Sequence, residues 1–138
     1  MQDTSVAVES TLEIRVRYNE TDGQARVHHA QYLNYFERGR VELLREMGYS
    51  YKDFERDGMM LVVAEMNIQY RAAAEFDDLL QLVTRVDHTG RVRIKHSYEL
   101  TRQVGDQPPE SIVSARSTIA CIDRAGKLCQ LPDYMRAR

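Results

Sequence analysis

The stretch from Arg17 to Arg40 reads RYNETDGQARVHHAQYLNYFERGR, and its pattern changes from loop to helix along the way. Just before and into it, residues 11–18 alternate apolar and charged side chains, which is the period of a half-buried strand. Residues 19–26 are polar and carry turn-forming types. From residue 30 to residue 47 apolar side chains recur at helical spacing, and Gly48 is placed to end the helix. The sequence therefore predicts a strand, a polar loop and one long helix.

The rest of the chain is rich in β-forming residues. After a short helical turn over residues 51–57, it predicts strands at 59–70, 79–86, 92–100 and 112–122, with turns at 87–90 and 105–109. Short connections without helices require antiparallel neighbours, and the single helix must cover one face of the sheet. We therefore expect an α+β fold with the order β-α-β-β-β-β, in one domain over residues 11–138 after a flexible tail at residues 1–10.

Composition bounds the class of protein. The chain has 138 residues, of which 43% are hydrophobic and 29% charged, with a formal net charge of -2. This length fits one core, and the near balance of charge gives no reason to expect a nucleic-acid partner. We find neither a secretory signal pattern nor an apolar run that would span a membrane, so we expect a soluble, cytoplasmic protein. Cys121 and Cys129 lack the spacing of a disulfide framework or zinc site and are expected to be reduced packing thiols.

Thr21-Asp22, then His29 seven residues on, then Tyr32 in the helix, resembles the 4-hydroxybenzoyl-CoA thioesterase family, in its branch of small bacterial acyl-CoA thioesterases. The resemblance continues in three later segments, residues 62–71, 76–78 and 131–132. It implies a hot-dog fold, in which a strongly curved antiparallel sheet wraps round the long helix. It also implies a homodimer or homotetramer with active sites between protomers, an acyl-CoA or acyl-carrier-protein substrate, and no cofactor.

Thioester hydrolysis needs a base or nucleophile, and a positive group where the carbonyl oxygen gains charge. The carboxylate of Asp22 can attack the carbonyl or activate a water, and the sequence leaves both open. Residues 27–30 lead into a helix whose first N–H groups lack internal partners. By the resemblance, the backbone N–H of His29 is the oxyanion donor. From the pattern alone, Thr-Asp-Gly is also ordinary turn chemistry, so Asp22 as a simple turn residue stays open.

Four further residues are candidates for substrate binding. Val27 and His28 precede the proposed donor, and Tyr32 falls at the family's aromatic position near the acyl pocket. Arg91 follows a predicted hairpin turn near which the resemblance places the CoA phosphates. The alternatives are a simple core position for Tyr32 and a solvated strand face for Arg91.

Other chemistries fit the sequence less well. The pair His28-His29 invites a metal, but adjacent side chains are expected to point in different directions and no third ligand is spaced to converge on them. Rival carboxylates, expected to lie on solvated, ion-paired faces, are Glu37, Glu42, Glu46 and Glu65. A hot-dog dehydratase needs its own histidine motif, which we do not find.

Two departures from the family pattern motivate an alternative function. Ala25 stands where this branch usually has a glycine at a tight bend, and Arg26 follows it in place of an apolar residue. Alanine resists the positive φ that glycine accepts. His28 also replaces the commoner tyrosine. The alternative is a non-catalytic hot-dog protein that binds acyl-CoA or a partner.

Overall fold

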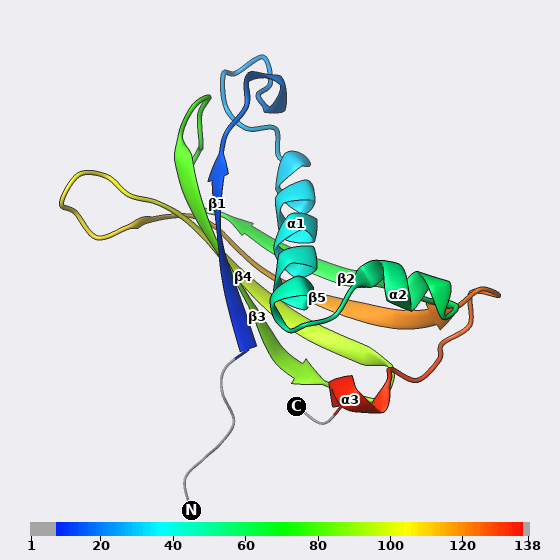
Figure 1. Ribbon diagram of the computed structural model, residues 1–138. Helices are drawn as coiled ribbons and strands as arrows, with labels where there is room; N and C mark the ends of the chain where they lie inside the picture. The colour runs from blue at the N-terminus through cyan, green and yellow to red at the C-terminus, as the bar shows by residue number, and fades with distance from the viewer. Residues whose placement is uncertain (1–7, 137–138) are drawn as a thin grey trace, which may run out of the picture.

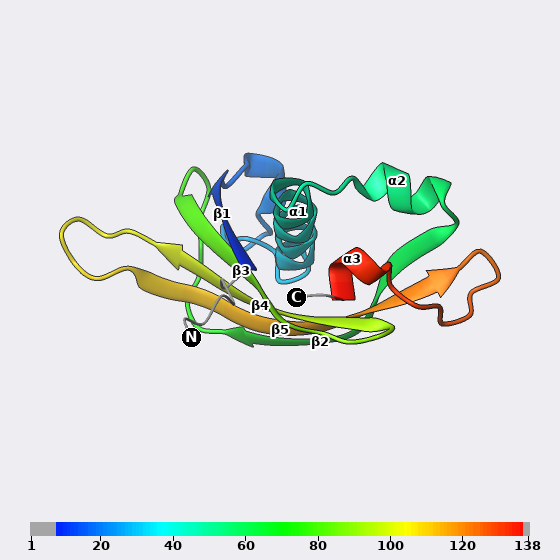
Figure 2. The same cartoon turned by 60° about the horizontal axis from the view of Figure 1, so that its bottom comes forward.

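The computed structural model describes residues 8–136, which form a curved five-stranded sheet with a long helix across one face (Figure 1 and Figure 2). The strands are β1 (Val8–Arg15), β2 (Met59–Tyr70), β3 (Leu79–Thr89), β4 (Arg93–Arg102) and β5 (Glu110–Asp123). They stand in the order β1-β3-β4-β5-β2, and every neighbouring pair is antiparallel. The α+β class and the order of the main elements are those that the sequence predicts.

The long helix α1 (Gln31–Glu46) packs over the β1 and β3 side of the sheet and leaves β2 largely exposed (Figure 2). Its buried stripe consists of Tyr32, Tyr35, Phe36, Gly39, Leu43 and Leu44. Gly39 permits a close approach to the sheet, because a Cβ there would lie 2.3 Å from Oγ1 of Thr84 on β3. The helix ends where Gly48 takes a φ of 93°, as the sequence predicts.

The first strand begins and ends earlier than the sequence predicts. β1 starts at Val8, so residues 8–10 of the expected tail belong to the sheet, and Ser10 is buried. The remainder of that tail, residues 1–7, lies outside the described residues. At the other end, the expected strand gives way to the short 3-10 helix η1 (Tyr18–Glu20), where the Glu20 carboxylate accepts the N–H of Arg17 at 2.8 Å. This side-chain bond stabilises a turn in place of further strand.

The later elements lie where they are predicted, within two residues at the ends of β4 and β5, apart from two larger differences. β2 has the predicted bounds, and the short helix α2 (Tyr51–Arg56) lies where a helical turn is predicted. The turn predicted at residues 87–90 is wrong for its first three residues. β3 continues to Thr89 because a bulge between Val86 and His88 lets the strand stay paired with β4. The helix α3 (Asp133–Arg136) is not predicted, since four residues are too few to show a helical period.

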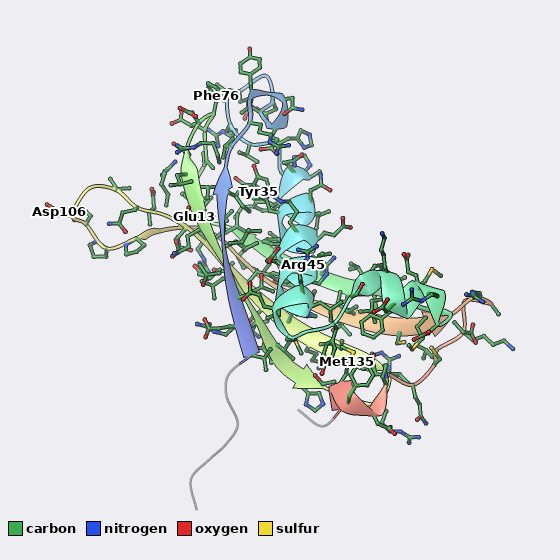
Figure 3. All side chains as sticks on the ribbon, in the orientation of Figure 1. Glu13, Tyr35, Arg45, Phe76, Asp106 and Met135 are labelled. Carbon is green, nitrogen blue, oxygen red and sulfur yellow. The ribbon has the colours of Figure 1, made fainter. Side chains whose placement is uncertain are left out.

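The core has two apolar clusters along α1. The first surrounds the N-terminal half of the helix and includes Ile14, Val27, Tyr35, Phe36 and Leu100. The second lies toward its C-terminal end and includes Leu44, Phe54, Ile94, Leu131 and Met135. Figure 3 shows Tyr35 and Met135 toward opposite ends of the helix. Within residues 8–136, no helix combines the length and apolarity needed to cross a membrane. The first cluster anchors the loop that enters α1.

Candidate active site

Backbone hydrogen bonds fold the loop before α1 into a short hairpin. Thr21 and Val27 pair as an isolated antiparallel bridge. The N–H of Asp22 donates to the Arg26 carbonyl at 2.8 Å, and the N–H of His28 donates to the Glu20 carbonyl at 2.9 Å. Asp22 and His28 therefore lie on facing arms of one hairpin, and His29 follows directly at the entry to the helix.

The hairpin is fixed to the body of the protein through Val27. Its side chain is buried in the first core cluster, and its N–H donates to the Ala74 carbonyl at 2.8 Å. Arg26 forms a second bridge to Glu75, in the segment between β2 and β3. The buried Val27 side chain is therefore turned into the core, and it is an anchor for the loop within this chain.

Asp22 combines a turn role with a free oxygen. Its Oδ1 accepts the N–H of Gln24 at 2.8 Å, which is the local bond that aspartate often makes in turns. Among residues 8–136, Oδ2 has no hydrogen-bond partner, and the side chain is half-buried. One oxygen thus orients the carboxylate, and the other is free to accept a proton or to attack a carbonyl carbon.

Ala25 adopts the bend that the family's glycine would favour. Its φ is 66°, in the left-handed region, and its N–H donates to the Asp22 carbonyl at 3.0 Å. A left-handed alanine costs about 1 kcal/mol, which the ladder on either side of the turn offsets. The hairpin therefore keeps a tight turn despite the substitution.

His28 and His29 are arranged differently from the sequence expectation. Their rings stack with centroids 4.3 Å apart and planes 25° from parallel, so the assumption that they point in different directions is wrong. Nδ1 of His28 accepts the N–H of Ala30 at 3.1 Å. In the described part of the chain, the N–H of His29 has no hydrogen-bond partner, and no three histidine, cysteine or acidic side chains group as metal ligands. An unpaired N–H at a helix entry can stabilise an oxyanion.

Tyr70 holds His29 from the edge strand β2. The hydroxyl of Tyr70 donates to the His29 carbonyl at 3.0 Å, and its ring centroid lies 5.8 Å from that of Tyr32. Tyr32 is buried against the first cluster, and burial raises the pKa of its hydroxyl. The sequence singled out Tyr32 but missed Tyr70, since nothing in the β2 pattern shows which residue reaches across to the helix entry.

An apolar strip extends from Tyr70 along the inner face of β2. Val63, Met66, Ile68 and Tyr70 are paired with residues 119, 117, 115 and 113 of β5, whose side chains are buried. Val63 is 49% exposed and Tyr70 is 52% exposed, because α1 lies on the same face but over β1 and β3, away from the β2 edge. We call these four residues the β2 strip. It gives the candidate site an apolar surface next to His29.

Glu20 braces the hairpin against the helix. Its Oε1 accepts the hydroxyl of Tyr35 at 2.7 Å, as well as the N–H of Arg17. Burial, and then the bond to Glu20, raises the pKa of Tyr35. The raised pKa keeps the Tyr35 phenol neutral, so that its hydroxyl can donate this hydrogen bond.

Arg102 braces the segment on which the hairpin rests. Its guanidinium donates to Asp78 Oδ2 at 2.6 Å, to Glu110 Oε1 at 2.6 Å and to the Ala73 carbonyl at 3.1 Å. Glu110 first, and also Asp78, raise the pKa of Arg102. Since Val27 is bonded to the neighbouring Ala74, this cluster fixes the hairpin indirectly.

Two groups of sequence candidates lie away from the hairpin. Arg91 is in the β3–β4 turn, where its carbonyl accepts the N–H of Leu131, and this end of the sheet lies beside α3, opposite the hairpin (Figure 1). Within one chain Arg91 is therefore not brought to Asp22. Of the rival acids, Glu42 pairs with Arg45 at 2.6 Å, and Glu37 and Glu65 are exposed.

Two hollows also lie away from Asp22 and His29. A cavity of about 260 Å³ under the C-terminal half of α1 is lined by Leu44, Leu61, Ile94 and His96, among others. Burial, with the Arg40 charge, lowers the pKa of His96 to about 3. A polar hollow of about 840 Å³ lies on the outer face of β2, β4 and β5. The hairpin and the β2 strip form an open surface instead.

A curved antiparallel sheet wrapped round one long helix defines the hot-dog class, and the comparisons confirm that fold. The chain belongs to the thioesterase-like superfamily, whose family model matches residues 16–138. It is 33% identical to the acyl-CoA thioesterase YbgC of Haemophilus influenzae over 113 residues, which cover 80% of this chain and 78% of that relative.

Solved structures agree with this membership. A DHNA-CoA thioesterase from Staphylococcus aureus superposes with a TM-score of 0.85 at 27% identity, covering 94% of this chain and 87% of that one. A 4-hydroxybenzoyl-CoA thioesterase complexed with 4-hydroxybenzoyl-CoA gives a TM-score of 0.86 over 94% of this chain and 97% of that one, at 15% identity. At that identity the second likeness shows the fold alone.

Proposed function

We propose that this chain hydrolyses acyl-CoA thioesters, with the Asp22 carboxylate as general base or nucleophile and the His29 N–H as oxyanion donor. The observation that carries the proposal is the hairpin. Asp22, whose carboxylate has a free oxygen, lies on one arm, and the other arm leads directly to the unpaired N–H of His29 at the entry to α1. The relative named acyl-CoA thioesterase supports the reaction class, and the family membership supports the same chemistry.

The chemistry follows from charge. As the thioester carbonyl is attacked, its oxygen becomes negative and accepts the His29 N–H, near the positive end of the α1 dipole. If Asp22 is the base, it takes a proton from water, the water oxygen bonds to the acyl carbon, and the carbon–sulfur bond breaks to release CoA thiolate. If Asp22 is the nucleophile, an acyl anhydride forms first and water then hydrolyses it. Both routes use the same two groups.

The β2 strip supplies the surface for the acyl group. It adjoins His29 through the Tyr70 hydroxyl, and its apolar side chains match an acyl chain or ring in character. In one chain the strip is open to water, so a thioester bound there would not be enclosed. We infer that a second copy of the chain completes the pocket by joining at the β2 edge, as a homodimer or as the unit of a homotetramer.

One of the two observations that favoured a non-catalytic binding protein no longer does so. It rested on a turn that alanine would distort, yet Ala25 adopts the left-handed conformation and the Asp22 hairpin stays closed. Arg26 is exposed, and its backbone holds the bridge to Glu75. Neither departure removes a group that the reaction needs.

The test measures the turnover of a panel of short, medium and aromatic acyl-CoAs by detecting the free thiol of the released CoA. Asp22→Asn keeps an oxygen that can accept the Gln24 N–H in the turn but removes the basic carboxylate, so kcat should fall about 10²- to 10⁴-fold. Asp106→Asn is the matched control, because Asp106 lies at the tip of the β4–β5 loop (Figure 3) and should leave kcat unchanged. Equal rates for wild type and Asp22→Asn would rule out Asp22 as the general base or nucleophile. Tight binding of acyl-CoA to wild type without thiol release would favour the binding protein.

A further inference from the structure

The two cysteines face each other at the end of the sheet. Cys121 is in β5, and Cys129 lies in the segment that returns beside it after the turn at Gly126. Ile122 and Leu128 form an antiparallel bridge, and the N–H of Cys129 donates to the Cys121 carbonyl at 2.9 Å. The cysteines are therefore directly opposite each other, and their Sγ atoms are 3.4 Å apart.

This geometry suits a disulfide. Directly opposed residues of an antiparallel pair have Cα atoms about 4.5–5.5 Å apart, inside the range that disulfides span. Both thiols are free, and the sulfurs need to approach by little more than 1 Å to reach a bond of about 2.05 Å.

The two thiols differ in access. Cys121 is 1% exposed, whereas Cys129 is partly exposed. Burial, and then the contact with Cys129, raises the pKa of the Cys121 thiol to about 12. A soluble oxidant therefore meets Cys129 first, and the buried Cys121 thiol reacts only afterwards, in an intramolecular step with the adjacent Cys129.

We propose that Cys121 and Cys129 form an oxidisable dithiol, which a low-molecular-weight disulfide such as oxidised glutathione converts to an intramolecular disulfide. In the first step the Cys129 sulfur bonds to one glutathione sulfur, and the other glutathione leaves as a thiolate that takes up the Cys129 proton. In the second step the Cys121 sulfur bonds to Cys129, and the second glutathione leaves with the Cys121 proton. Two protein thiols are oxidised, and one glutathione disulfide is reduced to two thiols. The inference does not depend on the proposed function.

The bond would tie the C-terminal segment to the sheet. Leu131 and Met135, which follow Cys129, belong to the second core cluster with Cys121, and Met135 also lines the cavity under α1. A covalent link between Cys121 and Cys129 lowers the conformational entropy of the unfolded chain in this segment, which stabilises the folded state. The oxidised protein should therefore hold α3 against the core more firmly than the reduced protein does.

In the test, the wild-type chain is incubated with oxidised or with reduced glutathione. Free thiols are then blocked by alkylation, and the mass of the intact protein is measured by mass spectrometry. We expect a product lighter by two hydrogen atoms that carries no alkyl group and no glutathione. Cys121→Ser should stop at the mixed disulfide on Cys129, and Cys129→Ser should keep its buried thiol reduced. The melting temperature of oxidised wild type should exceed that of reduced wild type by roughly 5 °C, and neither serine variant should show this shift.

Three results would overturn the proposal. Wild type that stays doubly alkylated in oxidised glutathione has no accessible dithiol. Wild type that accumulates only the mixed disulfide has cysteines that do not meet. A disulfide that forms only between chains, seen as a doubled mass, would place the reactive partner in another molecule.

Discussion

Ala25 carries the strain of the hairpin that holds Asp22. Its φ of 66° is disfavoured for alanine and free for glycine. Ala25→Gly should therefore raise the free energy of unfolding by up to about 1 kcal/mol in urea titrations. Ala125→Gly is the matched control, since Ala125 is also an exposed turn residue but does not take a positive φ, so glycine there should lower stability. If both variants lose stability equally, the left-handed turn is not formed.

His96 links stability to pH from inside the core. Burial lowers its pKa to about 3, whereas an unfolded histidine titrates near 6.5. Between those values the unfolded chain binds one more proton, so this group removes about 1.4 kcal/mol of stability for each pH unit below about 6. His96→Asn does not titrate, and its deficit against wild type should shrink between pH 7 and pH 4 in urea titrations. A constant deficit across that range would show that His96 is not buried in its neutral form.

Residues of the candidate site differ in how far the sequence reveals them. Asp22 and His29 lie in one short stretch, so a local motif is enough to single them out. Tyr70 meets His29 from 41 residues away, and a strand pattern does not show which residue makes such a contact. Arg91 lies at the far end of the sheet because the curve and register of β3 and β4, invisible in sequence, decide where that turn falls.

Among the elements, the segment between β2 and β3 depends on one cation. Arg102 bonds Asp78, Glu110 and the Ala73 carbonyl, and its side chain is 20% exposed. Arg102→Ala leaves these acceptors without their partner, so the free energy of unfolding should fall by about 2–4 kcal/mol. Denaturant titration measures the loss.

An exposed ion pair provides the control for Arg102. Arg85 meets Glu9 at 3.4 Å with both side chains largely in water, so Arg85→Ala should change stability by less than about 1 kcal/mol. A loss for Arg102→Ala no larger than this would mean that the cluster does not hold the segment.

The positions of the elements are largely predictable from periodicity and from the distribution of β-forming residues. The β-forming residues after Gly58 located β2 at both ends, and the apolar stripe located α1 within one residue at each end. The misses have local causes that no period records. Glu20 caps η1 through a backbone N–H, the bulge in β3 lengthens that strand, and residues 8–10 join the sheet only through pairing with β3. Such features depend on single contacts between segments.

At the scale of the whole molecule, β2 is an edge strand with exposed apolar residues on both faces. Val62 is 36% exposed and Val63 is 49% exposed, and such edges favour pairing with another chain. Wild type should therefore sediment as a dimer or larger, and Val63→Lys should dissociate it and reduce turnover together. Val104→Lys, at a residue 47% exposed in the β4–β5 loop, should do neither. A fully active monomer would contradict the inferred assembly.

The most direct test of the central claim is a crystal structure of the protein with a non-hydrolysable acyl-CoA analogue. We expect the analogue's carbonyl oxygen within about 3.2 Å of the His29 nitrogen, with a carboxylate oxygen of Asp22 within about 3.5 Å of the carbonyl carbon or of a bridging water. The acyl group should lie on the β2 strip. An analogue bound with its carbonyl remote from both groups in every protomer would contradict the claim.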